Sequence, residues 1–246
     1  MKFTQDRVGI VWFWLVAMFT GLLLSGCRTA HMAVSKELVF EATEMTVKGR
    51  QGLSFKKSFT FGPYSITDVN YGWTKTSSWG FQKFRSYKAE QNYEFILNET
   101  NGEIWEGQCA TEVGREALEF EDVFAGKIDV EFKSETYFVC TFKPKGEEKI
   151  WKFVMTQLSS KEVMNGVLSD GKTQIIIQGS RKLTGSPILL SHPTGYEFFH
   201  EDHIIGAVEV INEGIVWLYP SLSSQIRLAL ATTSAALLLY QNLSEY

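Results

Sequence analysis

The chain lacks the short motifs that mark several common enzyme classes. Its 246 residues contain no Gly-x-Ser-x-Gly nucleophile motif, no P-loop and no Gly-rich dinucleotide fingerprint. It also lacks an excess of positive charge, because 24 Lys and Arg residues stand against 28 Asp and Glu residues. Nucleic-acid binding relies on basic side chains that neutralise phosphates, so no nucleic-acid partner is expected. No motif predicts a cofactor or a catalytic residue.

The first 27 residues have the order of an export signal. Lys2 and Arg7 precede a long apolar run over residues 8–24, and small residues follow it. The sequence Leu24-Ser25-Gly26-Cys27 at its end resembles the lipobox of bacterial lipoproteins. The resemblance implies cleavage before Cys27, a diacylglycerol on its sulfur and attachment to a membrane through that lipid. The alternative is an uncleaved anchor, although the 17 residues of the run lie at the lower limit for spanning a bilayer.

The signal divides the chain into four parts. Residues 1–26 are expected to be the signal peptide, residues 27–35 a lipidated tether, residues 36–219 an antiparallel β body, and residues 220–246 a C-terminal helix. The β body is either one domain or two lobes that divide near residue 112. The residue after Cys27 is Arg28 rather than Asp, and Asp at that place resembles an inner-membrane retention signal. If the source is Gram-negative, the resemblance therefore implies the periplasmic face of the outer membrane.

Cysteine is scarce, with only three residues in the chain. If Cys27 carries lipid, Cys109 and Cys140 remain in an oxidising compartment, where cysteines pair. The sequence therefore predicts a Cys109–Cys140 disulfide. Two buried free thiols are the alternative, because an unpaired cysteine packs as a small apolar side chain.

Apolar and polar residues alternate in several short segments. Phe55, Phe59 and Phe61 are separated by polar residues, which is typical of a strand with one buried face. Asn101-Gly102 and Asp170-Gly171 separate pairs of such segments and suit the two positive-φ positions of a type I′ hairpin turn. The fold class predicted is mainly β: an antiparallel, hairpin-rich sandwich or barrel-like body of about a dozen strands, with one C-terminal α-helix.

The last segment has the composition of a buried helix. Pro220 ends the final strand, and either Ser221 or Ser223 can cap the helix that follows. Residues 222–243 are rich in Leu and Ala, and residues 235–239 are apolar all round. Such a helix is buried on more than one side, so we expect it to pack against the β body rather than to span a membrane.

Two groups of residues are candidate binding sites. His192, His200 and His203 are metal-ligating residue types that lie near one another, although their spacing matches no known zinc helix, and a solvated loop is the alternative. Trp73 and Trp79 flank a short polar segment that contains Lys75. If exposed, they would form an aromatic platform for a glycan or peptide; if buried, they belong to the core.

These features predict a non-enzymatic envelope lipoprotein that serves as a binding or structural module for an envelope protein or glycan. The first alternative is a metal-dependent envelope enzyme that uses the three histidines. The second is an assembly subunit that docks through its C-terminal helix.

Overall fold

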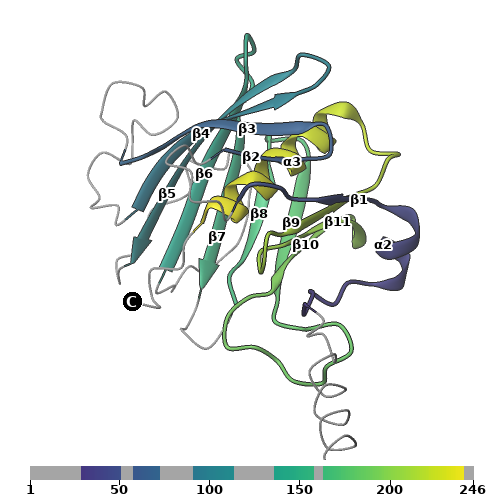
Figure 1. Cartoon of the computed structure of the whole chain (residues 1–246). Coiled ribbons are helices and arrows are strands. Elements are labelled where there is room, and N and C mark those ends of the chain that lie inside the picture. Colours follow the sequence, from purple (N-terminus) through teal and green to yellow (C-terminus); the bar gives the residue numbers. More distant parts are fainter. Residues whose placement is uncertain (1–28, 51–57, 73–90, 114–135, 158–162, 241–246) are drawn as a thin grey trace, which may run out of the picture. The chain divides into compact units, whose positions relative to one another are not determined.

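Short strands joined by tight turns make up most of the computed structural model, which describes residues 29–50, 58–72, 91–113, 136–157 and 163–240 (Figure 1). The elements in chain order are α2 (Lys36–Glu41), β1 (Thr43–Thr46), β2 (Phe59–Phe61), β3 (Tyr64–Tyr71), β4 (Gln91–Glu99), β5 (Ile104–Val113), β6 (Thr136–Pro144), β7 (Trp151–Gln157), β8 (Asn165–Ser169), β9 (Gln174–Ser180), β10 (Gly195–His200), β11 (His203–Glu209), β12 (Ile215–Leu218) and α3 (Ser224–Leu239).

The twelve strands form one antiparallel sheet that nearly closes into a barrel. Their order is β1-β12-β11-β10-β9-β8-β7-β6-β5-β4-β3-β2, so from β2 to β12 every strand pairs with its neighbours in sequence. The two ends meet where Lys48, just after β1, exchanges backbone hydrogen bonds of 2.9 and 3.0 Å with Thr60 of β2. The prediction of an antiparallel, barrel-like β body is confirmed, and the described strands form a single sheet rather than a sandwich.

The alternation of apolar and polar residues decides which side of each strand faces the interior. In β2, Phe59 and Phe61 are buried and Thr60 between them is exposed, as the sequence pattern predicts. Large side chains fill the interior, and the biggest of them are almost completely buried: Trp105, Trp151, Tyr64, Tyr93, Tyr196, Phe61, Phe95, Phe138, Phe142, Phe153 and Phe198.

The hairpin turns differ in type from the sequence prediction. A type I′ turn needs two consecutive residues with positive φ. In Asn101-Gly102 and in Asp170-Gly171 only the glycine has positive φ, so both turns are of another type. At the second turn, the Asp170 carboxylate accepts hydrogen bonds from the backbone N–H groups of the two residues after Gly171, which holds a wider loop. Two consecutive positive-φ residues do occur at Glu201 and Asp202, between β10 and β11.

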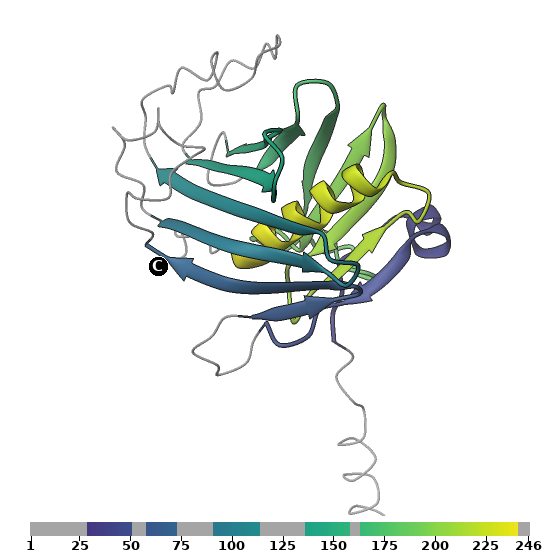
Figure 2. The same cartoon turned by 90° about the horizontal axis from the view of Figure 1, so that it is seen from above.

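The C-terminal helix α3 runs inside the barrel. Residues 228–239 are buried on every side of the helix, and Figure 2 shows α3 along the concave side of the curved sheet. Ser223 caps its first turn by accepting a hydrogen bond from the backbone N–H of Ile226, so one of the two predicted caps is confirmed. The helix is therefore enclosed by the β body. The sequence predicts only that it packs against the β body, so the helix is more deeply buried than predicted.

The β body begins with the short helix α2, whose buried Leu38 packs against Ala207 and Trp217. Residue 112 lies in β5, and β5 pairs with β6. The described residues before and after residue 112 therefore belong to one sheet. No helix among the described residues is long and apolar enough to cross a membrane.

Candidate functional site

The first described residues are bonded to one end of the barrel. The Ala33 N–H donates to the Lys182 carbonyl at 3.0 Å, and the Thr184 N–H donates to the His31 carbonyl at 2.9 Å. Between these two bonds, Met32 lies opposite Leu183 and is 1% exposed. Residues 31–33 therefore extend the structure at this end by one short antiparallel pairing.

A buried carboxylate strengthens this attachment. Glu209, the last residue of β11, is completely buried, accepts a 2.6 Å hydrogen bond from the Met32 N–H and lies 3.1 Å from Nδ1 of His31. Thr194 is also buried, and its hydroxyl donates to the carbonyls of Ser180 and Lys182 at 3.0 and 3.1 Å. Because a buried carboxylate needs partners, these contacts fix the place where the chain enters the barrel.

The long loop 181–194, between β9 and β10, receives this segment. It folds back on itself: the Leu190 N–H donates to the Arg181 carbonyl at 3.0 Å, and Lys182 lies opposite Leu189. The turn at its tip contains Gly185, which has a φ of +73°. Ile188 and Leu189, just beyond the turn, are 69% and 54% exposed. The loop thus presents two adjacent aliphatic side chains to solvent, beside the entering chain.

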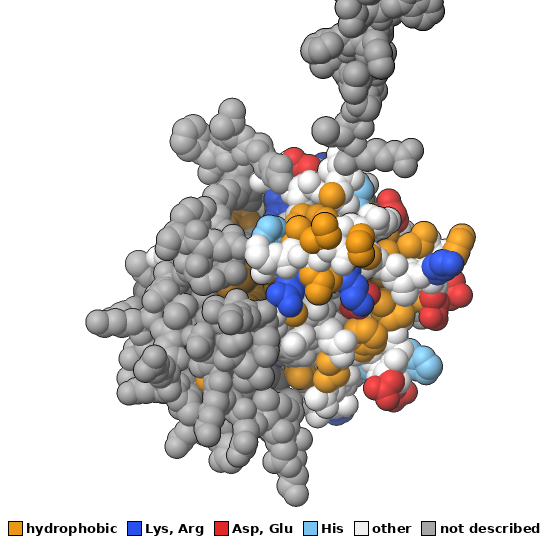
Figure 3. All heavy atoms as spheres, turned by 90° about the horizontal axis from the view of Figure 1, so that it is seen from below, with side chains coloured by type: hydrophobic (Ala, Val, Ile, Leu, Met, Phe, Trp, Pro, Cys, Tyr) orange, Lys and Arg blue, Asp and Glu red, His pale blue; other side chains and the backbone are white. Residues whose placement is uncertain are grey.

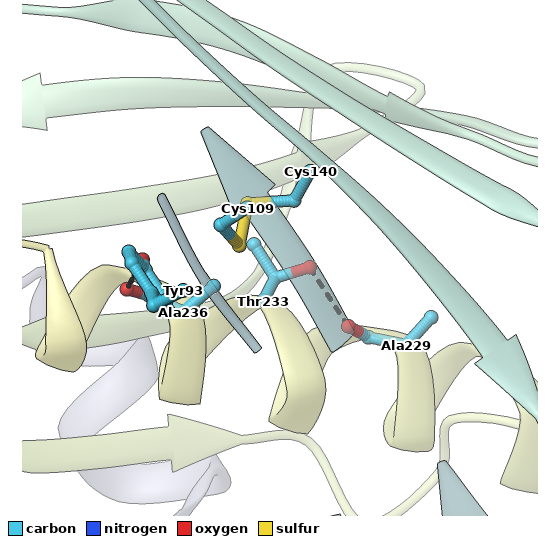
Figure 4. Close-up of a disulfide and its surroundings, with 6 residues drawn as sticks. All are labelled: Tyr93, Cys109, Cys140, Ala229, Thr233 and Ala236. Atoms are coloured by element: carbon cyan, nitrogen blue, oxygen red, sulfur yellow. Dashed lines mark hydrogen bonds between the residues drawn. A yellow bond between two sulfur atoms is a disulfide. The ribbon is translucent and has the colours of Figure 1, made fainter. Parts of the chain in front are cut away.

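The interior of the barrel is occupied by the protein's own side chains. Helix α3 contacts β5, β6, β11 and β12. The buried Tyr93 hydroxyl of β4 donates to the Ala236 carbonyl of α3 at 2.7 Å, and burial raises the pKa of Tyr93 well above its ordinary value (Figure 4). Tyr240, just after α3, packs against Phe138 of β6 with ring centroids 4.6 Å apart and ring planes tilted by 37°. The helix is thus held by both hydrogen bonds and ring contacts.

Three polar residues of α3 are completely buried, and their hydroxyl groups find hydrogen-bond acceptors within the helix itself. The hydroxyls of Thr232, Thr233 and Ser234 each donate to the carbonyl four residues earlier at 2.8 Å. This internal pairing satisfies the hydroxyls, so the helix can pass through an apolar interior.

Cys109 and Cys140 form a disulfide on the wall that faces α3 (Figure 4). They lie directly opposite each other on β5 and β6, with Cα atoms 4.1 Å apart, and both are completely buried. The predicted pairing is confirmed.

Arg50 fixes the C-terminal end of α3. Its guanidinium donates to the carbonyls of Leu238, Val210 and Asn212 at 2.9, 2.7 and 3.1 Å. The helix terminus carries partial negative charge and unpaired carbonyls, so a cation is favourable there. Burial lowers the pKa of Arg50, but a guanidinium remains charged at physiological pH. This arginine joins the β body to the helix although the two are far apart in the sequence, so no local sequence pattern indicates the contact.

Of the three histidines considered as metal ligands, two lie opposite each other and the third lies in a different loop. His200 and His203 lie opposite each other across the tight turn between β10 and β11. His192 lies in the loop 181–194, where its Nδ1 is 3.4 Å from the Ser191 hydroxyl. In the described part of the chain, no group of three or more His, Cys, Asp or Glu side chains is arranged to hold a metal ion. The geometry therefore does not gather the three histidines into one site.

The other predicted site residues lie outside the described residues: Cys27, Trp73, Lys75 and Trp79. A pocket that the sequence did not indicate lies near the middle of β3–β5. It measures about 280 Å³, and Asp68, Glu94 and Glu106 are among its lining residues.

Comparisons of the chain with protein-family models, with curated proteins and with solved structures found no match.

Proposed function

We propose that this chain is an envelope lipoprotein, anchored through lipid on Cys27, whose mature domain is a non-enzymatic binding or structural module. The observation that carries the proposal is the Leu24-Ser25-Gly26-Cys27 sequence after an apolar run. Several acyl chains, at about 0.8 kcal/mol for each buried methylene, hold a domain firmly on a bilayer.

The way the chain enters the barrel supports this anchoring. Residues 31–33 are bonded to the barrel end, and only three residues separate Cys27 from His31. A domain attached by so short a tether stays at the membrane surface. The disulfide at Cys109 and Cys140 also suits an exported protein, because such bonds persist in oxidising compartments.

The filled interior supports a role carried by the outer surface. Helix α3 occupies the space inside the sheet, and its residues 228–239 are buried all round. A partner or glycan would therefore bind the rims or outer faces of the barrel. For the same reason, α3 as folded offers little surface to another subunit, so the geometry does not favour docking through the helix.

Replacement of Cys27 tests the proposal. The variant Cys27→Ser should retain its signal segment and lose the lipid, whereas Ser25→Ala, which keeps small residues before the cysteine, should be processed normally. Metabolic labelling with a radioactive fatty acid and the apparent mass of the product measure both events. If Cys27→Ser has the same mass and the same membrane retention as the natural protein, the segment is an uncleaved anchor and the lipid assignment is wrong.

A further inference from the structure

We infer that the barrel end formed by the loop 181–194 rests on the membrane surface, with Ile188 and Leu189 inserted among the lipid headgroups. This inference rests on the proposed lipid anchor at Cys27 and adds an orientation to it. The occupant of the apolar surface is the bilayer that holds the anchor.

The tether brings this end of the barrel to the bilayer. Cys27 and His31 are four residue steps apart, which span at most about 14 Å even in a fully extended chain. The His31 carbonyl accepts a hydrogen bond from Thr184, which lies inside the loop 181–194. The backbone of Cys27 therefore lies within about 14 Å of His31, which is itself hydrogen-bonded to this loop, so a lipid on Cys27 enters the membrane beside it.

The loop carries exposed apolar side chains at the right place. Among the described residues, five large apolar side chains are more than a third exposed: Val39, Phe40, Ile176, Ile188 and Leu189. Only Ile188 and Leu189 lie in the loop that binds the tether. Seen from the side that bears this loop, hydrophobic side chains gather around Lys and Arg side chains (Figure 3).

The loop is also built to hold these side chains outward. The Ile188 N–H donates to the Ser186 hydroxyl at 3.1 Å, and the Leu190 N–H donates to the Arg181 carbonyl. These bonds satisfy backbone groups on both sides of Leu189. An ordered backbone that presents aliphatic side chains loses little conformational freedom when they insert.

The charges around the loop suit an anionic headgroup layer. Arg181 and Lys182 begin the loop, and Lys182 is exposed. Among the described residues, two acidic groups lie near: Glu197 is partly exposed and interacts electrostatically with Lys182, which offsets part of its charge, and Glu209 is completely buried beside His31. Basic side chains close to a bilayer are attracted to anionic lipids, so this face combines the two features of an interfacial surface.

A fluorescent probe at Leu189 tests the inference in the mature, lipidated protein. Leu189→Cys would provide the one free thiol, because Cys27 carries lipid and Cys109 is joined to Cys140. The probe is nitrobenzoxadiazole, and the protein is placed in vesicles of phosphatidylethanolamine and phosphatidylglycerol. The matched control is Lys172→Cys, in the turn before β9, whereas the loop follows β9. The seven residues of β9 put the two probes roughly 20 Å apart.

We expect the emission of the probe at residue 189 to shift to shorter wavelength on vesicles and to lose its quenching by iodide. The probe at residue 172 should remain fully quenched. Equal quenching at both positions, in protein whose lipid is confirmed by mass, would overturn the docking inference and leave the lipoprotein assignment intact. If Cys27 carries no lipid, the proposed function fails and the docking inference fails with it. Melting temperatures equal to that of the natural protein show that both variants are folded.

Discussion

The position of α3 inside the barrel predicts that two chemically identical substitutions have very different effects. Leu230, in α3, is completely buried, whereas Leu189, in the loop 181–194, is 54% exposed. Leu230→Ala removes the same atoms as Leu189→Ala. The first change leaves a cavity among packed side chains, and the second leaves only solvent.

The expected cost of Leu230→Ala is about 3 kcal/mol, within the range for a buried leucine. The strands on several sides of α3 limit how far the cavity can collapse, so the loss of packing is not relieved by relaxation. For a domain of this size, about 3 kcal/mol lowers the melting temperature by roughly 6–12 °C. Leu189→Ala should change stability by no more than about 0.5 kcal/mol.

Urea unfolding followed by tryptophan fluorescence measures both values on the disulfide-bonded protein. The midpoint should fall for Leu230→Ala with an unchanged slope, and the Leu189→Ala curve should overlay that of the natural protein. Equal midpoints for the two variants would refute the enclosed position of the helix.

Three further predictions follow from single contacts. Arg50→Met should lower the free energy of unfolding by about 2 kcal/mol, and more than Arg50→Lys does, because charged hydrogen bonds to backbone carbonyls are lost; equal values in urea would contradict this. Replacing both Cys109 and Cys140 by Ala should lower it by up to about 3.7 kcal/mol, from the 31-residue separation of the two, and a stability equal to the natural protein's would refute the role of the bond. Burial alone would raise the pKa of Asp170, but hydrogen bonds from Lys149 and the turn backbone outweigh it and lower that pKa. The carboxylate therefore stabilises the fold above the ordinary pKa of about 4, and the advantage of the natural protein over Asp170→Asn should shrink as the pH falls below that value; an advantage independent of pH would contradict the assignment.

The sequence predicted the parts of the fold that depend on neighbouring residues. Alternation identified strands such as β2, and one of the two serines considered as caps, Ser223, does begin α3. The disulfide followed from a count of cysteines and from the export signal. Each of these signals is local or compositional, so it can be read from the sequence without knowledge of the tertiary structure.

The turn types show where local signals fail. Asn101-Gly102 was expected to supply two positive-φ residues, yet only Gly102 has positive φ. Glu201, a residue type that rarely has positive φ, has it here together with Asp202, because β10 and β11 pair right up to these two residues. Strand pairing therefore overrode the preference of the turn residues.

The enclosed position of α3 could be predicted only in part. Residues 235–239 are apolar all round, which predicted burial on more than one side. Thr232, Thr233 and Ser234 interrupt the apolar sequence of the helix, but their hydroxyls are hydrogen-bonded within the helix, so they are buried as well. The polarity of a residue type alone does not reveal whether its hydroxyl will be hydrogen-bonded to the helix backbone.

The contacts at the candidate site are long-range and gave no sequence signal. Glu209 accepts a hydrogen bond from Met32 across 177 residues, and Arg50 reaches the carbonyl of Leu238 across 188 residues. Nothing near these residues in the sequence indicates such partners. The same holds for the exposed Ile188 and Leu189, which become significant only because the tether is bonded beside them.

The most direct test of the lipoprotein assignment is the intact mass of the protein purified from its native membrane, with sequencing of its N-terminal peptide. We predict a chain that begins at Cys27 and carries a diacylglycerol on the cysteine sulfur. A chain that still contains residues 1–26, with an unmodified thiol at Cys27, would contradict the account.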